Sequence, residues 1–116
     1  MKKIVAGCLL MAFAVVSHAQ YSGPNAASIA TTVKQLQDAG KDDQQVRLQG
    51  YILQNLGDEK YLFADDTGQI LVEIDHDRWP AGQSINEKTK VELVGEYDKE
   101  IIGKSKVDVD GITVIR

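Results

Sequence analysis

Apolar and polar side chains alternate with a period of two residues in several short segments of this chain, all of them after residue 44. Alternation of this kind is typical of β-strands that bury one face, because successive side chains in a strand point to opposite sides of the sheet. The pattern predicts five strands, at residues 46–52, 60–64, 69–74, 91–96 and 106–115. Turn-forming residues separate these segments, so they do not join into longer elements.

Two of the predicted strands contain residues that interrupt regular pairing. Gly50 indicates a bulge or a sharp bend in the first strand, and Asp110-Gly111 indicates a bulge in the last. A tight turn is expected at residues 65–68, between the second and third strands. The connection between the third and fourth strands, residues 75–89, is longer and contains Trp79-Pro80.

A short helix is predicted before the first strand. Ile29, Val33 and Leu36 recur at spacings of four and three residues, which places them on one helical face. Ser28 is expected to cap the start of this helix, and Gly40 to end it.

Together these elements predict a mainly all-β fold. Five short strands, a glycine in the first, a tight turn after the second and a longer connection after the third match the OB-fold, a five-stranded Greek-key barrel. The helix is then an extra N-terminal α-helix on that barrel. A β-sandwich is the alternative, but sandwiches usually need seven strands. We expect one OB-fold domain over residues 28–116.

The beginning of the chain has the three parts of a secretory signal peptide. Lys2 and Lys3 precede an apolar run over residues 4–16, and Ser17-His18-Ala19 supplies the small residues at a cleavage site. We therefore expect residues 1–19 to be removed, residues 20–27 to form a flexible leader, and the mature protein to lie in the periplasm. A membrane anchor is the competing interpretation, but the apolar run is short for a bilayer.

Removal of the signal changes the chemistry of the remaining chain. Cys8 is the only cysteine, so the mature protein has no thiol for a disulfide or a thiolate metal site. Loss of Lys2 and Lys3 leaves 11 basic residues against 17 acidic ones, a net charge of −6. Such a domain is not expected to bind nucleic acid, which requires clustered cations. No later segment is long and apolar enough to predict a membrane span in the mature protein.

Several motifs follow one another along the chain: Leu48-Gln49-Gly50, residues 57–63, Asp66-x-Gly68, residues 72–75, Trp79, Gly95-Glu96-x-Asp98 and Val107-Asp108-Val109. Taken in this order behind a signal peptide, they resemble the bacterial OB-fold (BOF) family of small periplasmic stress-tolerance proteins. The resemblance implies an OB barrel with an extra N-terminal helix and a degenerate helix between the third and fourth strands. It also implies a role in tolerating envelope stress, but it implies neither a reaction nor a cofactor.

Three carboxylates near the end of the third strand form a candidate metal site. On a strand, Glu73, Asp75 and Asp77 would project to the same side and share an oxygen-ligated cation, while His76 would face away. The alternative is an acidic strand end that is simply solvated.

Four aromatic residues are candidates for a ligand-binding platform: Tyr51, Tyr61, Phe63 and Trp79. In OB domains the faces of the second and third strands, with nearby loops, bind oligonucleotides or oligosaccharides. Without supporting cations, an aromatic face suits sugars or peptides better than phosphates. The alternative, which applies chiefly to Phe63 and Trp79, is that these rings close the barrel.

The sequence therefore predicts a non-enzymatic periplasmic binding protein. The expected partners are peptidoglycan glycan, a cationic peptide or an envelope protein, and the oligomeric state is left open. Weak divalent-metal binding or buffering is the alternative function. Asp66-Thr67-Gly68 matches the aspartic-protease signature, but a hairpin turn is favoured because Gln69 follows where those enzymes have Ala or Ser.

Overall fold

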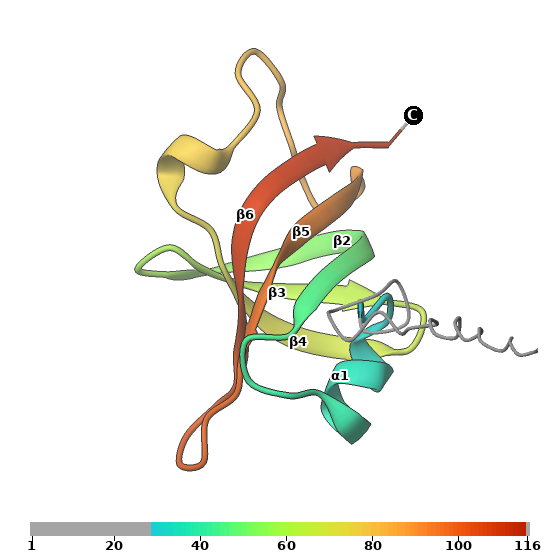
Figure 1. Cartoon of the computed structure of the whole chain (residues 1–116). Helices are drawn as coiled ribbons and strands as arrows, with labels where there is room; N and C mark the ends of the chain where they lie inside the picture. Colours follow the sequence, from blue (N-terminus) through green and yellow to red (C-terminus); the bar gives the residue numbers. More distant parts are fainter. Residues whose placement is uncertain (1–28, 116) are drawn as a thin grey trace, which may run out of the picture.

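The computed structural model describes residues 29–115 as one short α-helix, one 3₁₀ turn and five β-strands (Figure 1). The predicted signal peptide and leader, residues 1–27, and the predicted cap Ser28 lie outside the described residues. In chain order the elements are α1 (Val33–Ala39), β2 (Gln45–Gly57), β3 (Lys60–Asp65), β4 (Gly68–Glu73), η3 (His76–Arg78), β5 (Lys90–Asp98) and β6 (Lys106–Val114).

The five strands close into a barrel in the order β2-β3-β4-β6-β5, which confirms the predicted five-stranded barrel. All neighbours are antiparallel except β4 and β6, which pair in parallel through three residues each. The inward residues predicted by the alternation form the core: Val46, Leu48, Ile52, Ile70, Val72, Ile74, Val91 and Leu93 are all buried. Burial of these aliphatic side chains is the main force that holds the barrel together.

The first strand is longer than predicted and pairs on two sides. Residues 45–51 of β2 pair with β5, and residues 51–57 pair with β3. Pairing with β5 continues without a shift through Gly50, so this glycine marks a bend and not a bulge. A Cβ atom at Gly50 would lie 2.1 Å from the carbonyl oxygen of Ala64, so the bend brings two backbones into close contact.

A second close approach lies between β5 and β6. A Cβ atom at Gly95 would lie 2.0 Å from the carbonyl oxygen of Asp108. The predicted bulge in the last strand is confirmed beside it, because Val94 pairs with Gly111 and Gly95 with Val109, leaving Asp110 as the extra residue.

Helix α1 starts later than the sequence pattern suggested. Ala30 forms a parallel bridge with Val46, so the chain is still extended at this point and Ile29 is not helical. Thr32 is the N-cap instead, in a capping box with Gln35. Val33 is buried against the barrel as predicted. No helix within residues 29–115 is long and apolar enough to cross a membrane.

The turn between β3 and β4 fixes the start of this helix. One carboxylate oxygen of Asp65 accepts from the Thr67 backbone N–H (2.7 Å), the Thr67 hydroxyl (2.6 Å) and the Gly68 N–H (3.1 Å). Its other oxygen accepts from the Val33 N–H at 2.9 Å, and the Thr67 hydroxyl accepts from the Lys34 N–H at 3.0 Å. The turn thereby satisfies two of the free N–H groups at the helix start. The segment that resembles a protease motif thus has a structural role.

The charge state of Asp65 follows from these contacts. Partial burial alone would raise the pKa of Asp65, but the hydrogen bonds from Thr67, Val33 and Gly68 outweigh it and hold this pKa below its ordinary value.

We expect Asp65→Asn to lower the free energy of unfolding at neutral pH by about 1–2 kcal/mol, because charge-assisted bonds to backbone N–H groups are lost. Since the folded pKa is depressed, this stabilisation is complete above the unfolded pKa of about 3.9 and disappears as pH falls through the folded pKa. Urea unfolding at several pH values measures it. The exposed neighbour provides the control, Asp66→Asn, which should change little; an equal loss in both variants would contradict the capping role.

We expect Gly95→Ala to destabilise the barrel by at least about 2 kcal/mol, because the new methyl group would collide with the backbone at Asp108. Thermal unfolding measures the effect. Gly68→Ala is the matched control, since its methyl would meet only the side chains of Gln37 and Val33 at 3.3 Å or more. Equal stability of the Gly95 variant and the parent would show that the strands do not approach as described.

Candidate functional site

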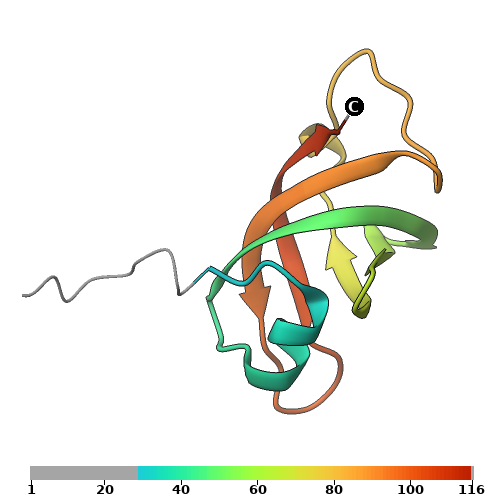
Figure 2. The same ribbon diagram turned by 90° about the vertical axis from the view of Figure 1, so that its right-hand side faces the viewer.

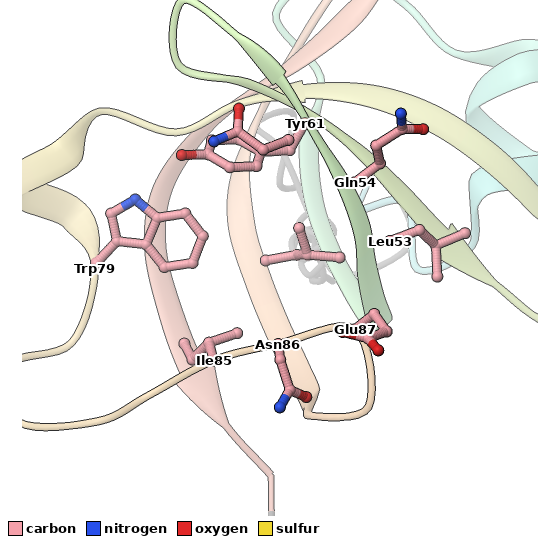
Figure 3. A pocket seen from close by; sticks show the side chains of 9 residues that line it. Leu53, Gln54, Tyr61, Trp79, Ile85, Asn86 and Glu87 are labelled. Atoms are coloured by element: carbon pink, nitrogen blue, oxygen red, sulfur yellow. The ribbon is translucent and has the colours of Figure 1, made fainter.

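A cleft of about 420 Å³ opens between the outer end of β2, strand β3 and the connection from β4 to β5 (Figure 3). Its volume is within the range of about 300–1,000 Å³ that is usual for small-molecule sites. The lining residues are Ile52, Leu53, Gln54, Asn55, Tyr61, Trp79, Ile85, Asn86 and Glu87.

Two aromatic rings form one wall of the cleft. The ring centroids of Tyr61 and Trp79 are 5.2 Å apart and the ring planes meet at 71°, an edge-to-face contact. Both rings are half-buried and pack against the core. Trp79 follows η3 in an extended conformation (φ −69°, ψ 138°), which the next residue, Pro80, favours. Packing on Tyr61 and on the core holds the indole in place at the cleft.

The facing wall contains an apolar residue that a bulge turns outward. The register between β2 and β3 shifts between Ile52 and Gln54, so Leu53 is the extra residue. Ile52 keeps its place in the core, whereas Leu53 is 39% exposed beside the cleft. Ile85, from the long connection, completes the apolar part and packs against the core.

Amide side chains and one carboxylate supply the polar part of the lining. The side-chain oxygen of Asn55 accepts from the Gly57 N–H at 2.8 Å, and that of Asn86 accepts from the Lys88 N–H at 2.8 Å. Both amides therefore use an oxygen to hold their own turn and retain an NH₂ group as a donor. Glu87 adds acceptors, and the nine lining residues include no Lys or Arg.

The structure brings together two of the four predicted aromatic residues. Tyr61 and Trp79 share the cleft, as described. Phe63 is on the same inward side of β3 as Tyr61 but is completely buried, so its prediction as a ligand-binding residue is wrong. Tyr51 lines a separate polar depression of about 280 Å³ beside Lys90, and its role in binding stays a prediction.

The sequence prediction missed several residues of the cleft, above all Leu53 and Ile85. A signal was present at each position, because Leu53 directly follows the inward Ile52 and so breaks the alternation, and Ile85 is an isolated apolar residue in a polar connection. Asn86 and Glu87 carried no distinguishing pattern.

A second groove of about 390 Å³ lies along β3 and β4, and Lys104 and Ser105 of the β5–β6 loop also line it. Leu62 and Leu71 are paired neighbours on these strands, and both line the groove. Gln37 of α1 lies at one edge and donates to the Gln69 carbonyl oxygen at 2.7 Å, so the helix borders the groove without closing it. The lining is largely aliphatic and amide in character and has no aromatic pair.

The predicted carboxylate set Glu73, Asp75 and Asp77 is not brought together. Strand β4 ends at Glu73, and the 3₁₀ turn over residues 76–78 breaks the two-residue alternation on which the prediction relied. Glu73 instead lies 3.6 Å from the amino group of Lys106.

Within residues 29–115, a different group has the spacing of a metal site: Glu59, Asp75 and His76, whose ligand atoms lie within 4.8 Å of one another. The Nδ1 atom of His76 is 3.6 Å from Glu59 Oε2 and 3.8 Å from Asp75 Oδ1. His76, which was expected to face away, is therefore part of the group. All three residues are exposed, and weak divalent-metal binding stays a prediction.

Comparison with known proteins identifies the class. The profile of the family described as "Bacterial OB fold (BOF) protein" matches residues 14–114. The calcium-regulated OB-fold protein CarO of Pseudomonas aeruginosa is 42% identical over 98 residues, which cover 84% of this chain and 82% of CarO. Protein YgiW of Escherichia coli K12 is 40% identical over 116 residues, with 86% of this chain and 88% of YgiW covered.

Solved structures agree with this assignment. The structure of the hypothetical protein YgiW from E. coli has a TM-score of 0.69 and 36% identity, and covers 83% of this chain and 98% of that chain. The telomere capping protein Ten1 from Saccharomyces pombe shares the fold alone, with a TM-score of 0.55 and 20% identity over 75% of this chain and 79% of that one. The protein is therefore an OB-fold protein. It belongs to the bacterial OB fold (BOF) family.

We expect the contact between Tyr61 and Trp79 to stabilise the fold by about 1 kcal/mol beyond the separate burial of the two rings. A double-mutant cycle with Tyr61→Ala, Trp79→Ala and the double variant, measured by urea unfolding, gives this coupling energy. Tyr51→Ala combined with Trp79→Ala is the control pair, for which the effects should add. Additive effects in the Tyr61 cycle would contradict a preformed aromatic wall.

Proposed function

We propose that this chain is a non-enzymatic periplasmic protein that binds a cell-wall saccharide in the Tyr61–Trp79 cleft and thereby supports envelope stress tolerance. The observation that carries the proposal is a half-buried aromatic pair beside three amide side chains and one carboxylate. Membership of the BOF family supports the assignment to a small binding domain.

The chemistry of the lining suits a sugar. The apolar C–H face of a sugar ring packs against an aromatic wall, while its hydroxyl groups both donate and accept hydrogen bonds. Side-chain amides and a carboxylate match that mixture of donors and acceptors. An N-acetyl group on the sugar would place a methyl group against the apolar part at Leu53 and Ile85 and an amide near Asn55 or Asn86.

Other partners fit this cleft less well. The lining contains no cation, which argues against the phosphates of nucleic acids. Cationic peptides would be drawn to the acidic chain as a whole, but Glu87 is the only acidic residue in the lining, and attraction from more distant carboxylates is screened beyond about 8 Å at physiological salt. A peptide or an envelope protein therefore ranks behind a saccharide.

The lining also supports binding without catalysis. Hydrolysis of a glycosidic bond normally uses two carboxyl groups about 5–10 Å apart, one as the acid and one as the base or nucleophile. The nine lining residues contain one carboxylate, Glu87, and no histidine. A single acidic group in this position is suited to accepting hydrogen bonds from a bound sugar.

Because the chain has a single tryptophan, its fluorescence reports directly on this cleft. We expect an N-acetylglucosamine oligomer or a soluble peptidoglycan fragment to change the Trp79 emission in a saturable manner. Leu53→Ser and Glu87→Gln should each weaken binding about three- to tenfold, and Tyr61→Ala by about tenfold or more, since each removes a packing or polar contact worth about 1 kcal/mol.

The control variant is Tyr51→Ala, which removes an aromatic ring outside the cleft and should leave the affinity unchanged. Calorimetry on Trp79→Ala separates loss of binding from loss of the fluorescence signal. Saturable binding that is equally strong in all cleft variants, or no heat and no emission change at millimolar glycan, would overturn the proposal.

A further inference from the structure

The loop between β5 and β6, residues 99–105, carries the two most exposed large apolar side chains of residues 29–115. Ile101 is 101% exposed and Ile102 is 88% exposed, whereas the next such residue, Leu56, is 50% exposed. Isoleucine is among the residues most often buried in folded proteins. These two neighbouring isoleucines form an apolar tip that nothing within residues 29–115 covers.

Hydrogen bonds at its base anchor this loop to the barrel. The backbone N–H of Lys99 donates to Asp42 at 3.0 Å, and the Lys99 amino group donates to the Gly40 carbonyl oxygen at 3.2 Å. Across the base, the Glu100 N–H donates to the Ser105 hydroxyl at 3.0 Å. The loop projects from the lower end of the barrel (Figure 1). Its two isoleucines are almost fully exposed, so they do not pack back onto the barrel.

We propose that this loop inserts Ile101 and Ile102 into the surface of a phospholipid bilayer. A stable protein–protein interface buries about 800 Å² on each partner, which a narrow tip with two apolar side chains does not provide. Attachment to a bilayer needs only that an apolar segment reach about 5–10 Å into the boundary between headgroups and acyl chains. A protruding tip fits this requirement.

The charges of the loop fit the surface of an anionic membrane. Lys99 and Lys104 stand on either side of the two isoleucines, against one acidic residue, Glu100, so the loop is positive in a chain of net charge −4. The hydrogen bond that Glu100 shares with Asp98 raises the pKa of Glu100. Lys104 is exposed and long enough to place its amino group among lipid phosphates while the isoleucines insert.

This attachment would leave the saccharide cleft accessible. Figures 1 and 2, which differ by a rotation about the vertical axis, both place the β5–β6 loop at the lower end of the barrel and the β4–β5 connection at the upper end. That connection carries Trp79 and Ile85 of the cleft. A protein held by its lower loop would point the cleft away from the membrane.

The test mixes two components. One is the protein in the form that a host cell exports after expression of the full chain. The other is a preparation of extruded vesicles of phosphatidylethanolamine and phosphatidylglycerol in a 3:1 ratio. We expect the parent to co-sediment with these vesicles weakly and reversibly, and Ile101→Ser/Ile102→Ser to reduce the partition coefficient at least about tenfold. Lys104→Gln should reduce it a few-fold on these vesicles and hardly at all on phosphatidylcholine vesicles. Tyr51→Ser is the control, because Tyr51 is 37% exposed and lines a different depression from Lys104, and it should bind like the parent.

A site-specific probe gives an independent readout. Cys8, the only cysteine, lies in the predicted signal, so Ile102→Cys can carry an environment-sensitive nitrobenzoxadiazole label, with labelled parent as a check. We expect a blue shift on addition of vesicles for this label and none for a label at Ala81→Cys, which is exposed at the other end of the barrel.

Three outcomes would overturn the proposal. One is equal sedimentation of the parent and the double isoleucine variant, when both show the same thermal unfolding. Another is an unshifted Ile102→Cys label. The third is a loss of self-association in the double variant, seen by sedimentation equilibrium without vesicles, which would make this loop a contact between protein chains instead. Glycan binding in the cleft is measured separately and does not depend on the result.

Discussion

The bend of strand β2 at Gly50 is the constraint on which the rest of the molecule depends. A single strand pairs with β5 before the bend and with β3 after it, and this double pairing closes five strands into a barrel. The bend requires a residue without a Cβ atom, because the Ala64 carbonyl oxygen occupies the space that a side chain would take. Beyond the bend, the end of β2 continues past the core, and the bulge at Leu53 turns an apolar side chain out over the cleft.

The two ends of the barrel then differ in what they expose. At one end, the β4–β5 connection has only a 3₁₀ turn of three residues, and Trp79 covers the inner edge of β3 by packing on Tyr61. The Trp79 ring stabilises the fold through this contact, and its exposed part forms one wall of the cleft. At the other end, the anchored β5–β6 loop presents Ile101 and Ile102 to solvent. The proposed binding cleft thus lies beside the core, whereas the proposed membrane contact lies on a loop outside it.

Much of this architecture could be predicted from the sequence because strand patterns and turns are local. The alternation located all five strands, and Asp110-Gly111 located a bulge. The start of the helix could not be predicted locally, since the bridge from Ala30 to Val46 joins residues far apart in the chain. The aromatic residues of the site were predicted in part. Tyr61 and Phe63 lie on the same side of β3, and the sequence does not show which of the two rings reaches the surface. In the folded barrel Phe63 is buried and Tyr61 lines the cleft. The carboxylate prediction failed because it continued a strand pattern beyond the end of the strand.

In the proposed complex, a sugar ring packs against the indole of Trp79. The most direct measurement is the set of intermolecular nuclear Overhauser effects between an N-acetylglucosamine oligomer and the ¹⁵N,¹³C-labelled protein. We expect contacts from sugar ring protons to the Trp79 indole and the Tyr61 ring, with further contacts to the Leu53 methyl groups. Contacts confined to Leu62 and Leu71 would place the ligand in the other groove and show that the Trp79 cleft is not the binding site.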